Sequence, residues 1–378
     1  MSLPLVFPRR SPQHRAWQIG GYALIAALVL LVSFTQPSYQ LLNFSKVAAY
    51  AVAILGINIV TGYSGQVSLG HSAFFGLGAY TTAYLVADKD WPFLATIPVA
   101  AALGLLVGFL VGLPALRIQG LYLALVTLAI AAVFPVVLKM DALSDITGGS
   151  NGKPVSIDWQ KPGWFSLDVS NEGWEFLVCA AIAGLLFLLA SNMIRSRVGR
   201  AIVAVRDNPI GAVTSGVSLS LWKTGAFSVS AAYGAVGGSL FMLVIPIVSP
   251  DSVGFGLAFQ LITGLVLGGL ASMSGSLIGG LTMVFLPYYS AQWSGDKSFL
   301  FFDPVDSGLL ANVLYGALLI AAMFVMPGGI VSFVRSLRSR LIRFDPQPPT
   351  MPSPQGDEPP VNAVLAGSAG PTEAKGTA

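Results

Sequence analysis

Long runs of apolar residues, separated by short polar segments, cover most of the chain. A bilayer core of about 30 Å requires about 20 apolar residues in a helix, because backbone amides in lipid must be hydrogen-bonded within the segment. Runs of this kind predict an all-α polytopic membrane protein with about ten transmembrane helices. They lie at residues 16–34, 43–61, 70–87, 92–114, 119–139, 174–192, 223–245, 257–272, 275–291 and 309–326. The pair around Gly275 is short and could instead form a single re-entrant hairpin.

Basic residues indicate which way these helices cross. Lys and Arg resist translocation and accumulate in cytoplasmic loops. An even number of crossings puts both termini on one side, and if that side is the cytoplasm it receives every arginine. These are Arg9, Arg10, Arg15, Arg117, Arg195, Arg197, Arg200, Arg206, Arg335, Arg338, Arg340 and Arg343. The opposite side receives mainly aspartates, so the charge pattern and the helix count both predict two cytoplasmic termini.

The polar segments divide the chain into regions. Residues 1–15 form a short cytoplasmic segment. Residues 16–334 form the transmembrane domain, with an outer loop at 140–173 and a cytoplasmic loop at 193–222. Residues 335–378 begin basic and then become rich in Pro, Gly, Ser and Ala, which predicts a disordered cytoplasmic tail. The first apolar run is long enough to span and lacks a small-residue cleavage pattern, so we expect an uncleaved first helix rather than a signal peptide.

Composition supports a membrane protein and excludes a soluble enzyme. Hydrophobic residues make up 54% and charged residues 10% of the 378 positions, with a mean hydropathy of +0.74. Soluble domains carry about 25% charged residues. The net charge of +3 comes from scattered basic residues, so we expect no nucleic-acid partner. The single cysteine, Cys179, excludes a disulfide framework or a thiolate metal site.

The chain offers little chemistry for hydrolysis or metal binding. Its nearest approaches to a phosphate-binding loop, around Gly152 and Gly295, do not fit a glycine-rich turn ending in Gly-Lys-Ser/Thr. His14 and His71 lie far apart, and neither has a carboxylate at ligand spacing. We therefore expect no bound cofactor, no metal and no catalysis in this polypeptide.

Ionisable residues at unusual places leave two alternatives open. Asp141 and Asp145 are four residues apart, as in membrane enzymes that hold magnesium against lipid phosphates, although an acidic solvated outer loop explains them better. An ion-coupled transporter requires a group at membrane depth whose charge can change. Lys46 is the one basic candidate within the spans, and snorkelling of its stem to the outer interface explains it at least as well.

A polar break separates the second and third apolar runs. Residues 62–72 combine three glycines with several hydrogen-bonding side chains. Irregular backbone is tolerated at membrane depth only where it is buried in protein or lines a watery path. The break is therefore a candidate wall of a translocation path, with Gln66, Ser68, His71 and Ser72 as candidate contacts. An ordinary interhelical turn is an equally good interpretation, because Gly and Ser are common turn residues.

Glycines four residues apart recur within the apolar runs. Each pair gives a helix a flat face for close contact with a neighbour, which predicts a tightly packed bundle and indicates nothing about the substrate. The pairs are Gly104, Gly108 and Gly112; Gly234 and Gly238; Gly264 and Gly268; and Gly275 and Gly279.

The longest internal cytoplasmic loop carries four arginines followed by helix-start signals. Asn208 can cap a helix that begins at Pro209, where the missing proline N–H costs nothing. We expect a short helix from Pro209 to about Ser215, closed by Gly216 in the left-handed conformation. Such a helix is too short to span and too apolar to lie bare in water. Ile210 and its neighbours then need either a groove on a cytoplasmic protein or the lipid headgroups.

Several longer motifs occur in a fixed order along the chain. Gly62-Tyr63-Ser64-Gly65-Gln66-Val67-Ser68-Leu69-Gly70-His71 continues into Phe74-Phe75-Gly76-Leu77-Gly78-Ala79-Tyr80, and further landmarks lie at residues 113–122, 147–152, 249–252 and 326–329. In these motifs the chain resembles the LivM-type permease of ATP-binding-cassette (ABC) importers for branched-chain amino acids. The resemblance covers roughly residues 47–330, most of the predicted membrane domain.

The cytoplasmic loop shares this resemblance. Residues 197–201 and 206–208 are similar to the family's coupling loop, which docks on the ATPase subunit and transmits its closure. The resemblance makes an ATPase the expected partner of the short helix. The coupling residues it implies are Arg200, Arg206, Asp207, Asn208, Pro209 and Ile210. The loop departs from the usual family pattern at Pro209, Gly211 and Ser218, which bears on where the helix starts and on which ATPase fits.

The resemblance also implies partners and a location. These are a second permease of the same family, two cytoplasmic ABC ATPases that bind the ATP, and a substrate-binding protein on the outer face of a bacterial or archaeal cytoplasmic membrane. The expected substrates are branched-chain or other small hydrophobic amino acids. Related permeases serve urea, amides or small organic acids, which stay as alternatives beside an ion-coupled secondary transporter.

Overall fold

The computed structural model describes most of the chain between residues 25 and 341. The described residues are 25–116, 118, 120–155, 157, 161, 169–295, 313, 316, 317, 319–321, 324 and 328–341. Most of the described residues belong to one compact unit, within residues 21–338. Several predicted features therefore lie outside the described residues: the segment 1–15, most of the crossing at 309–326, Arg117 and the tail beyond residue 341.

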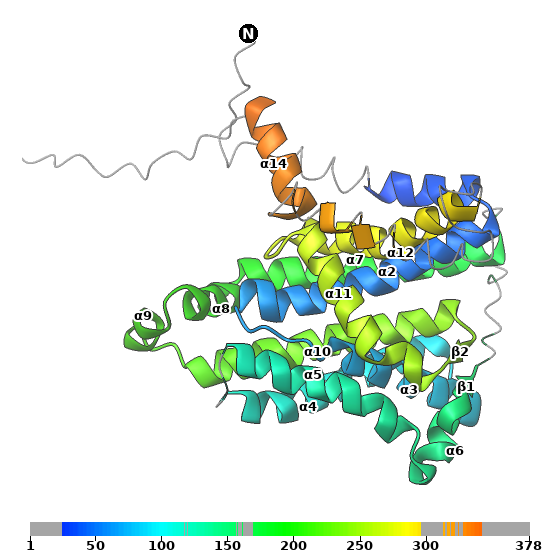
Figure 1. Cartoon of the computed structure of the whole chain (residues 1–378), viewed down its shortest axis with the longest axis horizontal. Coiled ribbons are helices and arrows are strands. Elements are labelled where there is room, and N and C mark those ends of the chain that lie inside the picture. The colour runs from blue at the N-terminus through cyan, green and yellow to red at the C-terminus, as the bar shows by residue number, and fades with distance from the viewer. Residues whose placement is uncertain are drawn as a thin grey trace, which may run out of the picture. The chain divides into compact units, whose positions relative to one another are not determined.

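Helices make up almost all of the described secondary structure (Figure 1). The long helices, in chain order, are Ile25–Thr35, α2 (Ser38–Ile57), α3 (His71–Lys89), α4 (Phe93–Ala115), α5 (Leu121–Leu138), α7 (Asn171–Arg195), α8 (Arg197–Asp207), α10 (Leu219–Val244), α11 (Phe255–Gly268), α12 (Met273–Gly295) and α14 (Gly329–Leu341). The short ones are the π-helix η1 (Asn58–Tyr63), η2 (Asp141–Leu143), α6 (Ser144–Thr147), η3 (Gly149–Asn151), α9 (Pro209–Thr214) and η4 (Pro250–Val253).

Five helices among the described residues are long and apolar enough to cross a membrane. They are α2 with η1, α4, α7, α10, and α11 with η4. A sixth is obtained if α5 and the η2–α6 segment, which meet at 74°, count as one span. Helices α3 and α12 have comparable lengths of 19 and 23 residues and pack into the same bundle. The prediction of a polytopic helical membrane protein is confirmed, whereas the count of ten and the cytoplasmic placement of both termini stay predictions.

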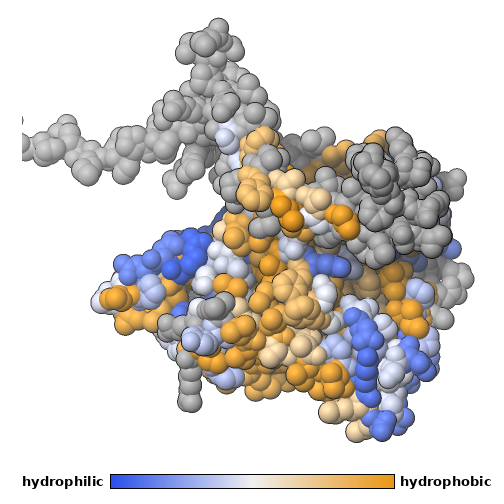
Figure 2. Space-filling view, in the orientation of Figure 1, coloured by the Kyte–Doolittle hydropathy of each residue, from blue (hydrophilic) through white to orange (hydrophobic). Residues whose placement is uncertain are grey.

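The centre of the bundle is the pair α2 and α10. In the most apolar 18-residue stretch of each span, 78% of the residues are buried in α2 and 89% in α10. The corresponding shares are 22% in α4 and 17% in α7. Helix α10 packs on α2, α3 and α4, and α2 also contacts α7, α11 and α12. Hydrophobic side chains gather over α5 and α11 on the visible face, whereas hydrophilic ones gather over α8 and around α6 (Figure 2). An apolar outer surface around a buried helix pair is what lipid as solvent requires.

Small residues allow the central helices to touch along their backbones. A Cβ placed on Gly238 of α10 would overlap the carbonyl oxygen of Phe75 on α3, and one on Gly268 of α11 would overlap that of Gly275 on α12. On α4, a Cβ at Gly104 would lie 2.8 Å from the Cβ of Ala235. These approaches confirm that the spaced glycines are packing sites, where van der Waals contact and not the hydrophobic effect holds helices together.

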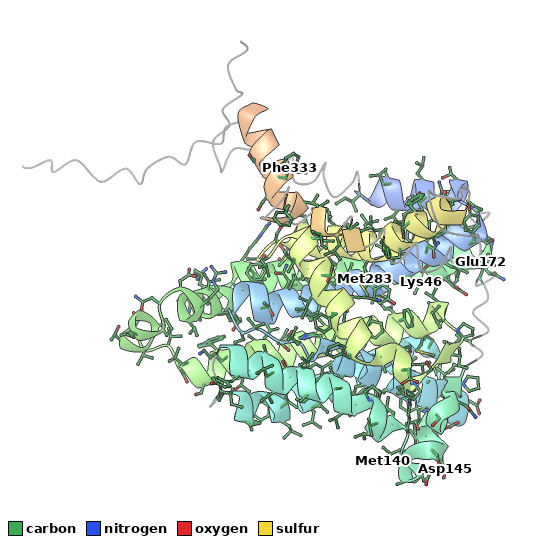
Figure 3. The ribbon with its side chains drawn as sticks, in the orientation of Figure 1. Lys46, Met140, Asp145, Glu172, Met283 and Phe333 are labelled. Carbon is green, nitrogen blue, oxygen red and sulfur yellow. The ribbon has the colours of Figure 1, made fainter. Side chains whose placement is uncertain are left out.

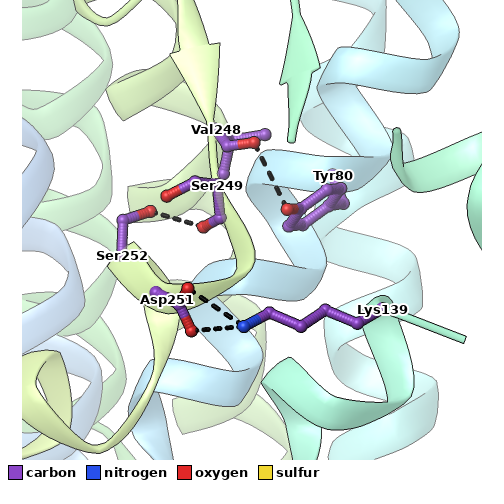
Figure 4. A network of polar contacts seen from close by, with 6 residues as sticks. All are labelled: Tyr80, Lys139, Val248, Ser249, Asp251 and Ser252. Atoms are coloured by element: carbon purple, nitrogen blue, oxygen red, sulfur yellow. Dashed lines mark hydrogen bonds and ion pairs between the residues drawn. The ribbon is translucent and has the colours of Figure 1, made fainter. Parts of the chain in front are cut away.

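The predicted outer end of the bundle is joined by a two-residue antiparallel sheet and by ion pairs. Strand β1 (Lys153–Pro154) pairs with β2 (Ile247–Val248), an element that the hydropathy pattern does not predict. Lys139 at the end of α5 contacts Asp251 of η4 at 2.7 Å, and the Tyr80 hydroxyl donates to the Val248 carbonyl (Figure 4). These contacts fasten the outer loop and η4 to α3 and α5.

We expect Gly238→Ala to destabilise the bundle by about 1–3 kcal/mol, because the new methyl group meets the α3 backbone and cannot move aside. Gly225→Ala is the matched control on the same helix, since a Cβ there meets nothing within 4 Å. Thermal unfolding of the detergent-solubilised protein, followed by size-exclusion chromatography, compares the two. A Gly238→Ala protein as stable as Gly225→Ala would contradict this packing.

Candidate coupling and translocation sites

The predicted polar break lies at an unusual distortion of α2. At Asn58 the helix widens into the π-helix η1, and the irregular segment 64–70 then leads to the start of α3 at His71. Single π-turns inside α-helices often mark functional sites. Gly65 has φ +71°, a conformation that favours glycine, and a Cβ there would lie 2.7 Å from the Arg206 Cγ. The break is therefore more than a simple turn, because it brings the predicted cytoplasmic loop (residues 193–222) against the end of α2.

The four residues predicted along the translocation path are all buried within the chain. Their exposed fractions are 8% for Gln66, 0% for Ser68, 1% for His71 and 0% for Ser72. The Gln66 Nε2 donates to the Ser64 hydroxyl at 2.8 Å and to the Lys223 carbonyl at 3.1 Å, which ties the break to the start of α10. Their role in translocation stays a prediction, and in this conformation they connect helices.

His71 stands in a directed chain of hydrogen bonds. The Ser230 hydroxyl donates to the Gly56 carbonyl at 2.5 Å, so its oxygen accepts from the His71 Nε2 at 2.6 Å. The Nε2 therefore carries a proton, and the His71 Nδ1 lies 3.4 Å from the Ser68 hydroxyl. These hydrogen bonds join α3, α10 and α2 through the His71 ring. Sequence reasoning missed Ser230 because it is one small polar residue inside a long apolar run.

Two buried hydroxyls, those of Ser72 on α3 and Thr224 on α10, have no hydrogen-bond partner within the described residues. Buried polar groups are nearly always paired, by protein or by ordered water.

The predicted short helix of the cytoplasmic loop is present. Asn208 caps α9, its Oδ1 accepting from the Gly211 N–H at 2.9 Å, and Pro209 occupies the first turn. The helix ends at Thr214, and Gly216 has φ +79°, as predicted. Before it, residues 197–207 form α8, whose apolar Ile202 and Val205 are buried on the bundle side. The i, i+3 spacing of these two residues is the sequence signal for α8.

The candidate coupling residues divide into two groups by the direction they face. Ile210 and Val213 of α9 are 80% and 52% exposed, and Arg200 and Pro209 are exposed as well. Arg206 instead turns toward the bundle, where its Nη1 donates to the Gly62 carbonyl at 2.8 Å and its Nε to the Asp207 carboxylate at 2.8 Å. Ile210 and Val213 thus form an apolar tip on α9, next to the arginine-bearing helix α8.

The remaining ionisable candidates do not form a site among the described residues. Asp141 and Asp145 are exposed on the turn that follows α5, where Figure 3 labels Asp145 beside Met140. No three His, Cys, Asp or Glu side chains in the described part of the chain are grouped to hold a metal ion. Lys46 lies half-buried on α2 (Figure 3).

Residues 41–323 match the family model described as branched-chain amino acid transport system / permease component. The chain belongs to this permease family. It is 30% identical over 288 residues to the high-affinity branched-chain amino acid transport system permease protein LivM of Escherichia coli, which covers 69% of this chain and 66% of that protein. The match thus spans slightly less than two thirds of LivM.

More distant relatives are covered more completely. This permease is 24% identical over 303 residues to LivH of Escherichia coli, a match that covers 75% of this chain and 91% of LivH. It is 24% identical over 286 residues to BraD of Pseudomonas aeruginosa, covering 73% and 92% of the two chains. Both are named high-affinity branched-chain amino acid transport system permease proteins. No solved structure matches the permease.

We expect Asn208→Ala to loosen α9 at a cost of about 0.5–2 kcal/mol, because the first turn of the helix loses its capping oxygen. Hydrogen exchange of the amides in residues 209–215 is the measurement, and it should become faster. Ser218→Ala is the matched control, since Ser218 precedes α10 without making a capping bond. Equal exchange in the two variants would show that the cap does not hold α9.

Proposed function

We propose that this chain is a membrane-spanning permease subunit of an ABC importer in a bacterial or archaeal cytoplasmic membrane. It forms part of the translocation path for branched-chain or other small hydrophobic amino acids. Two separate ATPases supply the free energy, a second permease of the same family completes the path, and a substrate-binding protein delivers the substrate at the outer face. The permease itself performs no catalysis and binds no cofactor.

The observation that carries this proposal is the exposed apolar tip of α9. Ile210 is 80% exposed on α9, which projects with α8 from one end of the bundle (Figure 1). A large apolar side chain so exposed beside basic residues is typical of an anchor that inserts into a groove on a partner. A cytoplasmic ATPase, which changes shape when it binds and hydrolyses ATP, is the partner that the family resemblance supplies.

The proposed mechanism follows from how the loop is held. Helix α8 packs on α7 and α10, and α9 packs on α8. If the ATPase closes while it is bound to α9, it therefore displaces α8 and, through α8, the membrane helices α7 and α10. Such a displacement favours one of two arrangements of the helices and exposes the path to one side of the membrane at a time. No ionisable group at membrane depth is required, because the driving force comes from the partner.

The substrate class rests on the relatives. LivM, LivH and BraD are named for branched-chain amino acid transport. Hydroxyl and amide groups around the break suit the polar ends of an amino acid, and the apolar helices suit its side chain. Urea, amides or small organic acids are the alternative substrates, and they share the need for hydrogen-bonding groups along the path.

The test of this function is uptake in liposomes. The permease is reconstituted with its partner permease, the ATPases and the binding protein, and we expect uptake of radiolabelled leucine that requires ATP. A competition series of isoleucine, valine, urea and acetamide assigns the substrate class. Uptake by this chain alone, driven by a proton or sodium gradient, would overturn the proposal.

We expect Ile210→Asp to weaken binding of the ATPase by at least about 2 kcal/mol, because a charge replaces an apolar anchor that becomes desolvated on docking. The ATPase should no longer co-purify with this variant. Ile247→Asp is the matched control, since Ile247 is 47% exposed on β2, at the predicted outer end. It should retain the ATPase. Normal co-purification with Ile210→Asp would exclude α9 as the docking element.

A further inference from the structure

A second break in the helices lies beside the first. Between α11 and α12 the chain leaves the helical conformation at residues 269–272, with φ +117° at Gly269 and φ +53° at Ala271. Ala271 is one of only two non-glycine residues with positive φ in the described part of the chain. An L-residue in this conformation is strained and persists only where its surroundings hold it. Those surroundings are supplied by α2.

Asn58, the first residue of the π-helix η1, holds the second break. Its Oδ1 accepts from the Ala271 N–H at 2.8 Å, and its Nδ2 donates to the Ser272 carbonyl at 2.7 Å and to the Ser276 hydroxyl at 3.0 Å. The side chain is fully buried. The amide thus binds two backbone groups within the α11–α12 junction and one hydroxyl on the first turn of α12, more than 200 positions away in the sequence. It satisfies backbone groups that lipid cannot.

The other end of η1 is bound to the cytoplasmic loop. The Gly62 carbonyl, which the end of a helix leaves without an intrahelical partner, accepts from the Arg206 Nη1 at 2.8 Å. A Cβ at Gly62 would overlap the Asn58 Oδ1 and lie 2.6 Å from the Ala271 nitrogen. Gly62 therefore touches Arg206 through its carbonyl and the Asn58–Ala271 bond through its α-carbon. No side chain lies between them to absorb a movement.

We propose that Asn58 is a positioning residue that passes a displacement of Arg206, through the π-helix η1, to the α11–α12 break at residues 269–272. The inference rests on the proposed function, since the displacement originates at the ATPase. π-turns are rare and occur frequently at functional sites, which fits a segment that transmits movement. Asn58 and Ala271 then move together, and the break opens or closes with the state of the ATPase.

The experiment follows a reporter at the break in the assembled, reconstituted importer. Leu270 is 53% exposed, so Leu270→Cys carries a nitroxide spin label. The one native cysteine, Cys179, is fully buried and does not compete for the label. The mobility of the label is compared without nucleotide and after trapping with ATP and vanadate. We expect a change in the parent protein, and unchanged mobility during active ATP-dependent uptake would overturn the proposal.

Asn58→Ala in this labelled background is the decisive variant. We expect the ATPase to remain bound and to hydrolyse ATP, while the nucleotide-dependent change at residue 270 and the substrate moved per ATP both fall at least about fivefold, the lower end of allosteric coupling factors. Ser45→Ala is the matched control, because Ser45 is equally buried on α2 but its hydroxyl bonds only its own helix, at Leu41. An Asn58→Ala protein with the parent response at residue 270 would overturn the proposal.

Two more variants separate coupling from folding and docking. Asn58→Ala leaves the strained Ala271 without its hydrogen-bond partner, and adding Ala271→Gly removes that strain. The double variant should therefore regain any protein yield that Asn58→Ala loses, but not the nucleotide-dependent response at residue 270. Recovery of the response would overturn the proposal. Arg206→Gln changes a partly exposed side chain and should lose the response while the ATPase stays bound through Ile210 and Val213. Loss of ATPase binding by Arg206→Gln would make Arg206 a docking residue and overturn the inference. Failure of the proposed function differs from all of these, because the parent protein then shows no ATP-dependent uptake.

Discussion

The constraint on which this structure depends is that backbone polar groups inside lipid must find partners within the protein. Most of the chain meets it with helices. Where the helices break, at residues 64–70 and 269–272, side chains join the irregular backbone to other segments. Asn58 binds the second break, the Gln66 side chain joins the first break to α10, and Arg206 of the predicted cytoplasmic loop binds the nearby Gly62 carbonyl. The irregular segments are thereby also the segments that connect distant parts of the bundle.

Close helix packing is what makes these connections possible. Gly238 allows the backbones of α3 and α10 to touch, and Gly268 and Gly275 do the same for α11 and α12. Only at such separations can short side chains such as Ser230 and Asn58 reach a backbone carbonyl of a neighbouring segment. Small residues and short polar residues therefore act together: the first set the distance between helices, and the second use it to join them.

The candidate coupling residues of the 193–222 loop face in two directions. Ile210 and Val213 face away from the bundle, where a partner can bind them, whereas Arg206 faces the end of α2. A loop with both faces is suited to receive a force on one side and deliver it on the other. The four residues predicted along the path are buried, and His71 is hydrogen-bonded to Ser68 and Ser230.

The sequence by itself determined the helical membrane fold, the packing glycines and the capped helix that begins at Pro209. Each depends on local features: the length of an apolar run, a spacing of four, or an Asn-Pro pair followed by glycine. The tertiary structure alone decided the contacts of Asn58, Ser230 and Arg206, as well as the β1–β2 pair and the left-handed Ala271. Their partners lie far away in the chain, and a single polar residue in an apolar run does not indicate which distant backbone group it will meet.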